Sequence, residues 1–271
     1  MNKRILVMGI LLTFLFLLVG CDTQTTTTTT SSETTTTTTS GVSVVTSNTA
    51  VALADSIPSD CAITTVEDGW VPVWCDEFQY TGGVDLSKWS VVVGGGGFGN
   101  NELQYYTNRQ ENLYVDGEYL NITALMENYG GYNYTSAKIW TTNTETWKYG
   151  KFEMRAKLPA GRGTWPAFWM MPASSKYGGW PDSGEIDIME HVGYDMNVVH
   201  GTIHTDRFNG SNGRGGSTSI LLTEGLVTSI DVANEFHTYG IEWDETSITW
   251  FYDGLAFASV GYDPELSGTV L

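Results

Sequence analysis

Residues 184–190, Gly-Glu-Ile-Asp-Ile-Met-Glu, constrain the fold most, because they crowd three acids among apolar side chains. Carboxylates are costly to hold together, since each raises the energy of its neighbours' charged forms. In a strand, Glu185 and Asp187 share one face and the isoleucines fill the other. Glu190 would fall on the wrong face unless one bulged residue near Met189 restores the parity. The segment therefore predicts a bulged strand with three carboxylates on one face, which is an acid/base arrangement.

Short apolar runs separated by turn signals recur along the rest of the chain. They lie at residues 119–125, 136–141, 150–158, 198–204, 236–243 and 247–252. Residues 152–158 alternate almost strictly between apolar and polar side chains, as in a half-buried strand. The pair Asp253-Gly254 between two such runs is typical of a two-residue hairpin. Because long amphipathic helix patterns are missing, the sequence predicts an all-β fold, an antiparallel β-sandwich or jelly roll.

The charge balance narrows the range of partners. The chain has 31 acidic and 13 basic residues, a formal net charge of −18. A strongly acidic protein is a poor ligand for nucleic acid or for anionic lipid, so neither is expected to bind the folded domain directly. The 10 Trp and 14 Tyr residues suit a β-rich core, and those exposed in a groove would suit the apolar faces of sugar rings.

The N-terminus has the pattern of an export signal. Two basic residues precede the mostly apolar residues 5–19, a stretch shorter than a membrane-spanning helix needs. Residues 18–21, Leu-Val-Gly-Cys, resemble the bacterial lipoprotein cleavage box. This resemblance implies a signal peptide over residues 1–20 and lipidation of Cys21; the alternative is an ordinary signal peptide with an incidental cysteine. A lipidated chain would be anchored at the extracellular face of the bacterial cell membrane.

Residues 21–56 are of low complexity and contain two uninterrupted threonine runs. Such a segment has too little apolar surface to offset the entropy of ordering, so it predicts a disordered tether. The folded domain is expected over residues 57–271. Two further cysteines, Cys61 and Cys75, could form a disulfide in an exported protein or remain free buried thiols.

The acidic strand suits the hydrolysis of glycosidic bonds. That reaction needs one protonated carboxyl group to donate to the leaving oxygen and one ionised carboxylate to attack or to activate water. A neighbouring carboxylate helps to keep one proton in place and so separates the two pKa values. Glu185 and Glu190 could divide these duties, with Asp187 between them to orient Glu185.

Residues 185–190 resemble the active-site motif of family-16 glycoside hydrolases. Met189 corresponds to the inserted residue of the bulged form, which is typical of laminarinases. Further segments match the family in order and spacing: residues 97–107, 134–139, 149–153, 163–170, 200–204 and 236–239. The resemblance covers essentially all of residues 70–260.

The resemblance implies a retaining enzyme with a β-jelly-roll fold and a concave carbohydrate-binding cleft. Glu185 would be the nucleophile, Glu190 the acid/base and Asp187 an assistant to Glu185. The implied reaction is cleavage of internal β-1,3-glucosidic bonds in laminarin-like glucans by double displacement. The alternatives are a mixed-linkage glucan or galactan hydrolase of the same family and a non-catalytic glucan-binding module, whose known examples lack the glutamates.

The same resemblance indicates which residues contact the polysaccharide. They are Asn100, Trp165, Trp169, Trp180 and His204. Core packing is the alternative for the tryptophans, and a satisfied buried position is the alternative for the histidine. No cofactor is required and no metal ligand is predicted, although some family members bind a structural Ca²⁺ that this domain could also hold. A monomer is expected, and because family members continue beyond the last strand of this chain, the domain is expected to be truncated at its C-terminus.

Overall fold

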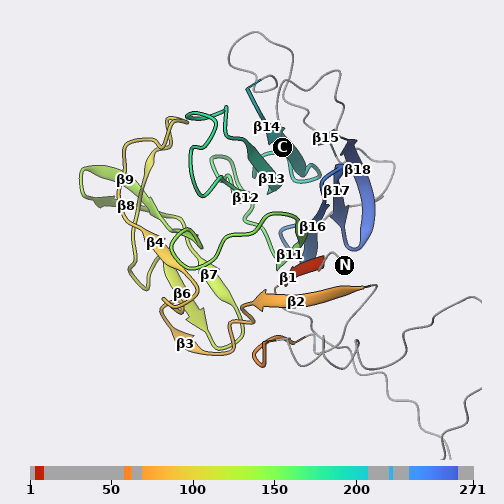
Figure 1. Cartoon of the computed structure of the whole chain (residues 1–271). Helices are drawn as coiled ribbons and strands as arrows, with labels where there is room; N and C mark the ends of the chain where they lie inside the picture. The colour runs from red at the N-terminus through yellow and green to blue at the C-terminus, as the bar shows by residue number, and fades with distance from the viewer. Residues whose placement is uncertain (1–3, 9–57, 63–68, 207–219, 222–231, 262–271) are drawn as a thin grey trace, which may run out of the picture.

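The computed structural model describes residues 4–8, 58–62, 69–206, 220–221 and 232–261. This part of the chain consists of β-strands and connecting loops without any helix, which confirms the predicted all-β class (Figure 1). Among the described residues there is therefore no helix long and apolar enough to cross a bilayer. The tether and Cys21 lie outside the described residues, as does most of the predicted signal peptide, so all three stay predictions.

Two sheets carry the main architecture (Figure 1). The larger sheet has the order β18 (Leu255–Gly261), β17 (Ser247–Tyr252), β16 (His237–Trp243), β11 (Gly150–Ala156), β1 (Arg4–Met8) and β2 (Trp70–Cys75). The smaller sheet has the order β12 (Ala167–Met170), β13 (Glu185–Glu190), β14 (His200–His204) and β15 (Ile220–Leu221). β1 pairs in parallel with both of its neighbours and lies within the predicted signal peptide, so cleavage before Cys21 would remove it from the sheet.

Three small sheets complete the described fold. Their strands are β3 (Thr81–Gly82), β6 (Leu113–Asp116) and β7 (Leu120–Ile122); β5 (Gln104–Tyr106), β9 (Tyr132–Ser136) and β8 (Leu125–Tyr129); and β10 (Lys138–Trp140) with β4 (Ser90–Val92). β5 pairs with β9 in parallel. Apart from this pair and the two pairings of β1, the strand pairings of the described residues are antiparallel. Each apolar run from which a strand was expected contains at least one strand.

The core lies between the two main sheets. Ile186 and Ile188 of β13 pack in one cluster with Ile241 of β16 and with Ile248 and Trp250 of β17. These side chains are almost completely buried, as expected for the inward faces of a sandwich. The acids that alternate with the isoleucines therefore face away from the larger sheet, so the register of the core decides which face of β13 carries the chemistry.

The hairpin between β17 and β18 has the predicted turn. Asp253 and Gly254 have φ values of 47° and 75°, and left-handed backbone at both central positions is what a type I′ turn requires. The Asp253 carboxylate also accepts a 2.8 Å hydrogen bond from the backbone N–H of Thr238 on β16. The turn is thus tied to the neighbouring strand as well as to its own hairpin.

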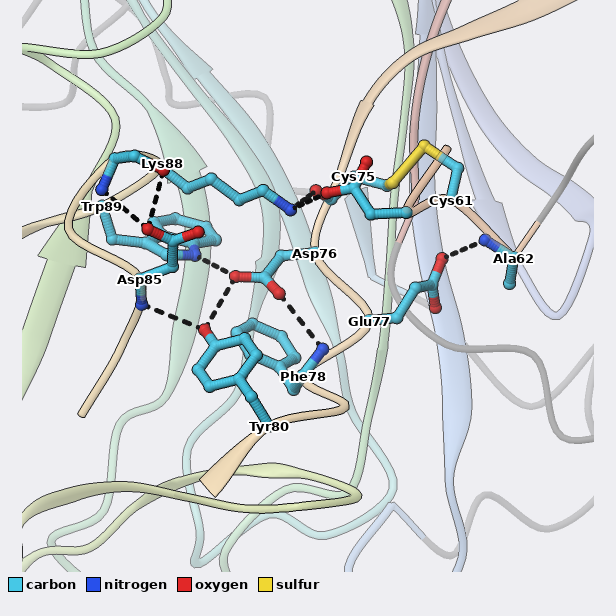
Figure 2. Close-up of polar contacts among 12 residues, drawn as sticks. Cys61, Ala62, Cys75, Asp76, Glu77, Phe78, Tyr80, Asp85, Lys88 and Trp89 are labelled. Atoms are coloured by element: carbon cyan, nitrogen blue, oxygen red, sulfur yellow. Dashed lines mark hydrogen bonds and ion pairs between the residues drawn. A yellow bond between two sulfur atoms is a disulfide. The ribbon is translucent and has the colours of Figure 1, made fainter. Parts of the chain in front are cut away.

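A clasp formed by Asp60, Cys61, Cys75 and Lys88 fastens the start of the domain to the end of β2 (Figure 2). Cys61 and Cys75 form a disulfide with their Cα atoms 5.5 Å apart. The Lys88 ammonium donates to Asp60 at 2.5 Å and to the carbonyl of Cys75 at 2.7 Å. A covalent bond and an ion pair therefore hold the same short segment.

Next to the clasp, the buried Asp76 carboxylate accepts three hydrogen bonds (Figure 2). The donors are the backbone N–H of Phe78 at 3.1 Å, the Tyr80 hydroxyl at 3.1 Å and the Trp89 indole at 2.8 Å. A buried carboxylate is tolerated only when its oxygens are paired in this way. The network positions the loop after β2 against the aromatic residues beneath it.

Removal of the disulfide is expected to lower the free energy of unfolding by about 3 kcal/mol, the value for closing a loop of roughly 15 residues. The two cysteines are 14 positions apart. Urea unfolding of the oxidised protein, the reduced protein and the Cys61→Ala/Cys75→Ala variant measures the effect. Equal midpoints for all three would contradict a bond that contributes to stability.

Candidate active site

The predicted bulge in β13 is confirmed by its pairing on both sides. Asp187 lies opposite Thr202 of β14 and Glu190 lies opposite His200, so two residues of β13 face the single residue Gly201. The register with β12 shifts at the same place. Ile188 and Met189, the two residues of the bulge, are 2% and 1% exposed. They enter different core clusters, and the strand resumes with Glu190 on the same face as the other acids.

Trp250 of β17 supports this bulge from the core side. Its indole N–H donates a 2.9 Å hydrogen bond to the carbonyl of Asp187, in the middle of the acidic strand. A Cβ on Gly201 would lie 2.4 Å from the Trp250 ring, so only glycine leaves room for the indole there. The core of the sandwich therefore holds the backbone from which the acids project.

Burial and the charge of Asp187 raise the pKa values of both glutamates. Loss of solvent, followed by the charge of Asp187, raises the pKa of Glu190 to about 7. The same two causes raise the pKa of Glu185 above its ordinary value. A carboxyl with a pKa near neutrality can carry a proton under ordinary conditions and release it when needed, as a general acid must.

Asp187 and His204 form a pair beside Glu185. Asp187 is 3% exposed, and its carboxylate lies 3.2 Å from Nε2 of His204 on β14. The hydrogen bond to Asp187 raises the pKa of His204 above its ordinary value. The structure thus brings His204 to the acids as expected, and shows that one of its two ring nitrogens already serves Asp187.

Two tryptophans donate their indole N–H groups to the glutamates. Trp165, in the loop before β12, lies 3.0 Å from Oε1 of Glu190. Trp180, in the loop before β13, lies 2.5 Å from Oε2 of Glu185. The two residues are 50% and 51% exposed, so ring surface remains open to solvent beside each acid. Both candidate residues are therefore brought to the acids.

Trp169 and Asn100 occupy different surroundings. Trp169 of β12 lies opposite Asp187 in the ladder, which places it beside the acidic strand. Asn100 lies exposed in the glycine-rich turn before β5, where its backbone N–H donates to the carbonyl of Gly97 at 2.8 Å. A contact between the Asn100 side chain and sugar stays a prediction.

Lys138 of β10 is the charged neighbour that sequence reasoning missed. Its ammonium lies 4.5 Å from the ring centroid of Trp169 and interacts electrostatically with both Glu185 and Glu102. Burial lowers the pKa of Lys138 against the influence of these acids. Glu102, in turn, accepts hydrogen bonds from the side chains of Gln104 and Tyr106 on β5. The sequence feature that could have pointed to Lys138 is a lone basic residue in a short strand of a strongly acidic chain.

The described residues offer two groups with several metal-binding atoms close together. One is Asp60 with Cys61 and Cys75, whose sulfurs are consumed by the disulfide. The other is Glu185, Asp187 and His204, which belong to the acid cluster. Calcium prefers six to eight oxygen ligands, and neither group resembles such a shell. A structural Ca²⁺ therefore stays an expectation without named ligands.

Comparison with known proteins identifies relatives of the chain. The family model described as Glycosyl hydrolases family 16 matches residues 99–267. A β-glucanase from Rhodothermus marinus is 51% identical over 189 residues, which are 68% of this chain and 63% of that protein. A glucan endo-1,3-β-glucosidase from Cryptopygus antarcticus is 43% identical over 190 residues, which are 68% of this chain and 67% of that protein.

The structural similarity agrees with the sequence similarity. The X-ray structure of the laminarinase from R. marinus matches with a TM-score of 0.64 and 47% identity, over 69% of this chain and 73% of that one. This chain spans 63% of the length of the R. marinus β-glucanase. The family match covers more than half of the chain and includes the whole acidic strand. The chain belongs to glycosyl hydrolase family 16.

Proposed function

We propose that this domain is a retaining endo-β-1,3-glucanase that cleaves internal bonds of laminarin-like glucans. The observation that carries the proposal is the bulged strand that presents two partly buried glutamates beside Asp187, one of them with a pKa raised to about 7. The names of the relatives, a β-glucanase, a glucan endo-1,3-β-glucosidase and a laminarinase, support the substrate class.

In the proposed mechanism Glu185 attacks the anomeric carbon while Glu190 donates its proton to the departing glycosidic oxygen. The bond from sugar to leaving group breaks and a glycosyl ester forms on Glu185. Glu190, now ionised, takes a proton from water, which attacks the same carbon from the opposite side and frees Glu185. Asp187, paired with His204, lies beside Glu185 and would orient it through both steps.

The alkaline limb of kcat/KM on laminarin is expected near pH 7, because Glu190 must be protonated to act and its pKa is raised to about 7. Activity should therefore fall as the pH rises through that value. The dinitrophenolate of an aryl β-glucoside departs without being protonated. The rate at which this substrate forms the glycosyl-enzyme should therefore not fall as the pH rises through about 7. Equal alkaline limbs for the two substrates would contradict the role of Glu190.

Substrate preference separates the proposal from its alternatives. Incubation of the full-length protein with laminarin, lichenan and agarose, followed by measurement of reducing ends, tests all three linkages. Fast release from laminarin supports the β-1,3-glucanase, whereas preferential release from lichenan or agarose assigns a mixed-linkage glucanase or a galactan hydrolase. Binding to laminarin without release would identify a glucan-binding module. Proton NMR of the first product should show retention of the β-anomer.

We further propose that the enzyme is a monomer anchored to the extracellular face of a bacterial membrane through lipid on Cys21. The lipoprotein-like cleavage box and the threonine-rich segment after it support this location. Expression of the full chain in bacteria with labelled palmitate tests it. Label on the wild type and its loss from Cys21→Ser, with release of the protein from the membrane, are expected; an unlabelled wild type would exclude the anchor.

A further inference from the structure

We propose that Trp165 and Trp180 are positioning residues, whose indole N–H groups each hold one oxygen of a glutamate and leave the other oxygen to react. This inference rests on the proposed function of the two glutamates. It differs from a role of the tryptophans as sugar-stacking surfaces, because the interaction uses the N–H group at the edge of each ring rather than the ring face.

The donor chemistry of tryptophan makes the assignment specific. An indole has a single N–H donor and no acceptor. Trp165 commits that donor to Oε1 of Glu190, and Trp180 commits its donor to Oε2 of Glu185. Neither N–H is then free for a sugar hydroxyl. The oxygens left for chemistry are Oε2 of Glu190, which would carry the transferable proton, and Oε1 of Glu185, which would attack.

The loop that carries Trp165 is fixed to the loop that follows the acidic strand. The backbone N–H of Gly161 donates to the carbonyl of Gly193 at 2.9 Å, and the N–H of Gly193 donates to the carbonyl of Thr164 at 3.1 Å. A Cβ on Gly193 would lie 2.0 Å from the Thr164 hydroxyl, so the two loops are in close contact. Trp165 is therefore presented to Glu190 from a backbone that is tied to the same strand.

Trp180 is held in a comparable way. It lies within a turn in which the backbone N–H of Asp182 donates to the carbonyl of Gly179 at 2.8 Å, and in the next turn the N–H of Gly184 donates to the carbonyl of Pro181 at 2.9 Å. The Trp180 ring also contacts His204, with ring centroids 5.7 Å apart. Glutamate has flexible side-chain torsions, so a donor of fixed position restricts where each carboxyl can lie.

The charges that face the glutamates come from several elements. Asp187 and the other glutamate lie on β13, His204 lies across on β14, and Lys138 reaches Glu185 from β10. His200 lies opposite Glu190, but its own electrostatic neighbours are Asp195 and His191. Against the desolvation that dominates at both glutamates, each indole N–H favours the ionised carboxylate and lowers its pKa. Loss of either donor should raise the pKa of its own glutamate most.

The variants Trp165→Phe and Trp180→Phe test the inference, because phenylalanine keeps an aromatic face and removes the donor. Trp165→Phe is expected to move the alkaline limb of kcat/KM upward by about one pH unit, and Trp180→Phe to move the acid limb upward by a similar amount. Each variant should lose about tenfold or more in kcat on laminarin. With the dinitrophenyl substrate, the defect of Trp165→Phe in forming the glycosyl-enzyme should disappear and that of Trp180→Phe should remain.

Trp89→Phe is the matched control, because it removes an indole N–H bond to a carboxylate, Asp76, that is not part of the acidic strand. It should lower the melting temperature and leave both pH limbs in place. Melting curves of all variants confirm that they are compared as folded proteins. If Trp165→Phe and Trp180→Phe raised KM but left both limbs of the pH profile of kcat/KM in place, the inference would be overturned and the tryptophans would only stack on the sugar. A wild type without hydrolytic activity would instead overturn the proposed function.

Discussion

Replacement of Glu185 by alanine is expected to lower kcat on laminarin by a factor on the order of 10⁴ or more, because no glycosyl ester can form without the proposed nucleophile. Replacement of Glu190 by alanine should cost about 10²–10⁴-fold, the usual contribution of a general acid. Reducing-end release under initial-rate conditions measures both. The two losses should not add in the double variant, because the residues act in one reaction sequence.

Azide distinguishes the two roles, since it is a small nucleophile that needs no proton removed. With a dinitrophenyl glycoside, Glu185→Ala and azide should give the α-glycosyl azide by direct attack, whereas Glu190→Ala should give the β-glycosyl azide from the glycosyl-enzyme. Glu118→Gln, an exposed acid in the turn between β6 and β7, serves as the control and should retain wild-type activity. Azide products of the opposite configuration would exchange the roles of the two glutamates.

Replacement of Trp250 by alanine is expected to lower the free energy of unfolding by about 3–5 kcal/mol, the cost of a large cavity in a core. Trp250 is 1% exposed, packs with the isoleucines of β13 and donates to the carbonyl of Asp187. Since a domain is stable by only about 5–15 kcal/mol, this loss is a large part of the total. Urea unfolding followed by fluorescence and circular dichroism measures it.

Two further variants make the Trp250 experiment specific. Trp140→Ala removes an indole that is 45% exposed and should change the free energy of unfolding by far less. Trp250→Phe keeps most of the packing but loses the hydrogen bond to the bulge, so it should lower activity at a temperature where the variant remains folded. Full activity in folded Trp250→Phe would show that the bulge keeps its geometry without that bond.

The sequence was most informative where one face of an element must be buried. The parity of residues 185–190 predicted the bulge, because acids and isoleucines cannot exchange faces without large cost. The turn at Asp253 and Gly254 was also predictable from local sequence, because a two-residue hairpin loop needs left-handed backbone at both positions to match the twist of its strands. In both cases the physics is local, and neighbours in the chain are also the neighbours that matter.

The sequence was least informative about contacts between distant segments. Nothing near Lys138 indicates that its ammonium reaches Glu185 from another sheet, and nothing near Trp165 indicates which atom its N–H will find. The parallel pairing of β5 with β9 is equally hidden, because the paired residues, such as Gln104 and Tyr134, lie 30 positions apart in the chain. Such contacts depend on the placement of loops, which apolar periodicity does not encode.

The clasp at the start of the domain determines how the protein would bear mechanical load. A pull on the chain before Cys61 passes through the disulfide directly to Cys75, so the chain between these two residues carries none of it. β2, which ends at Cys75, therefore carries no tension along its length. If the chain is held at its N-terminal end, as proposed, this covalent path would direct the tension into the body of the fold.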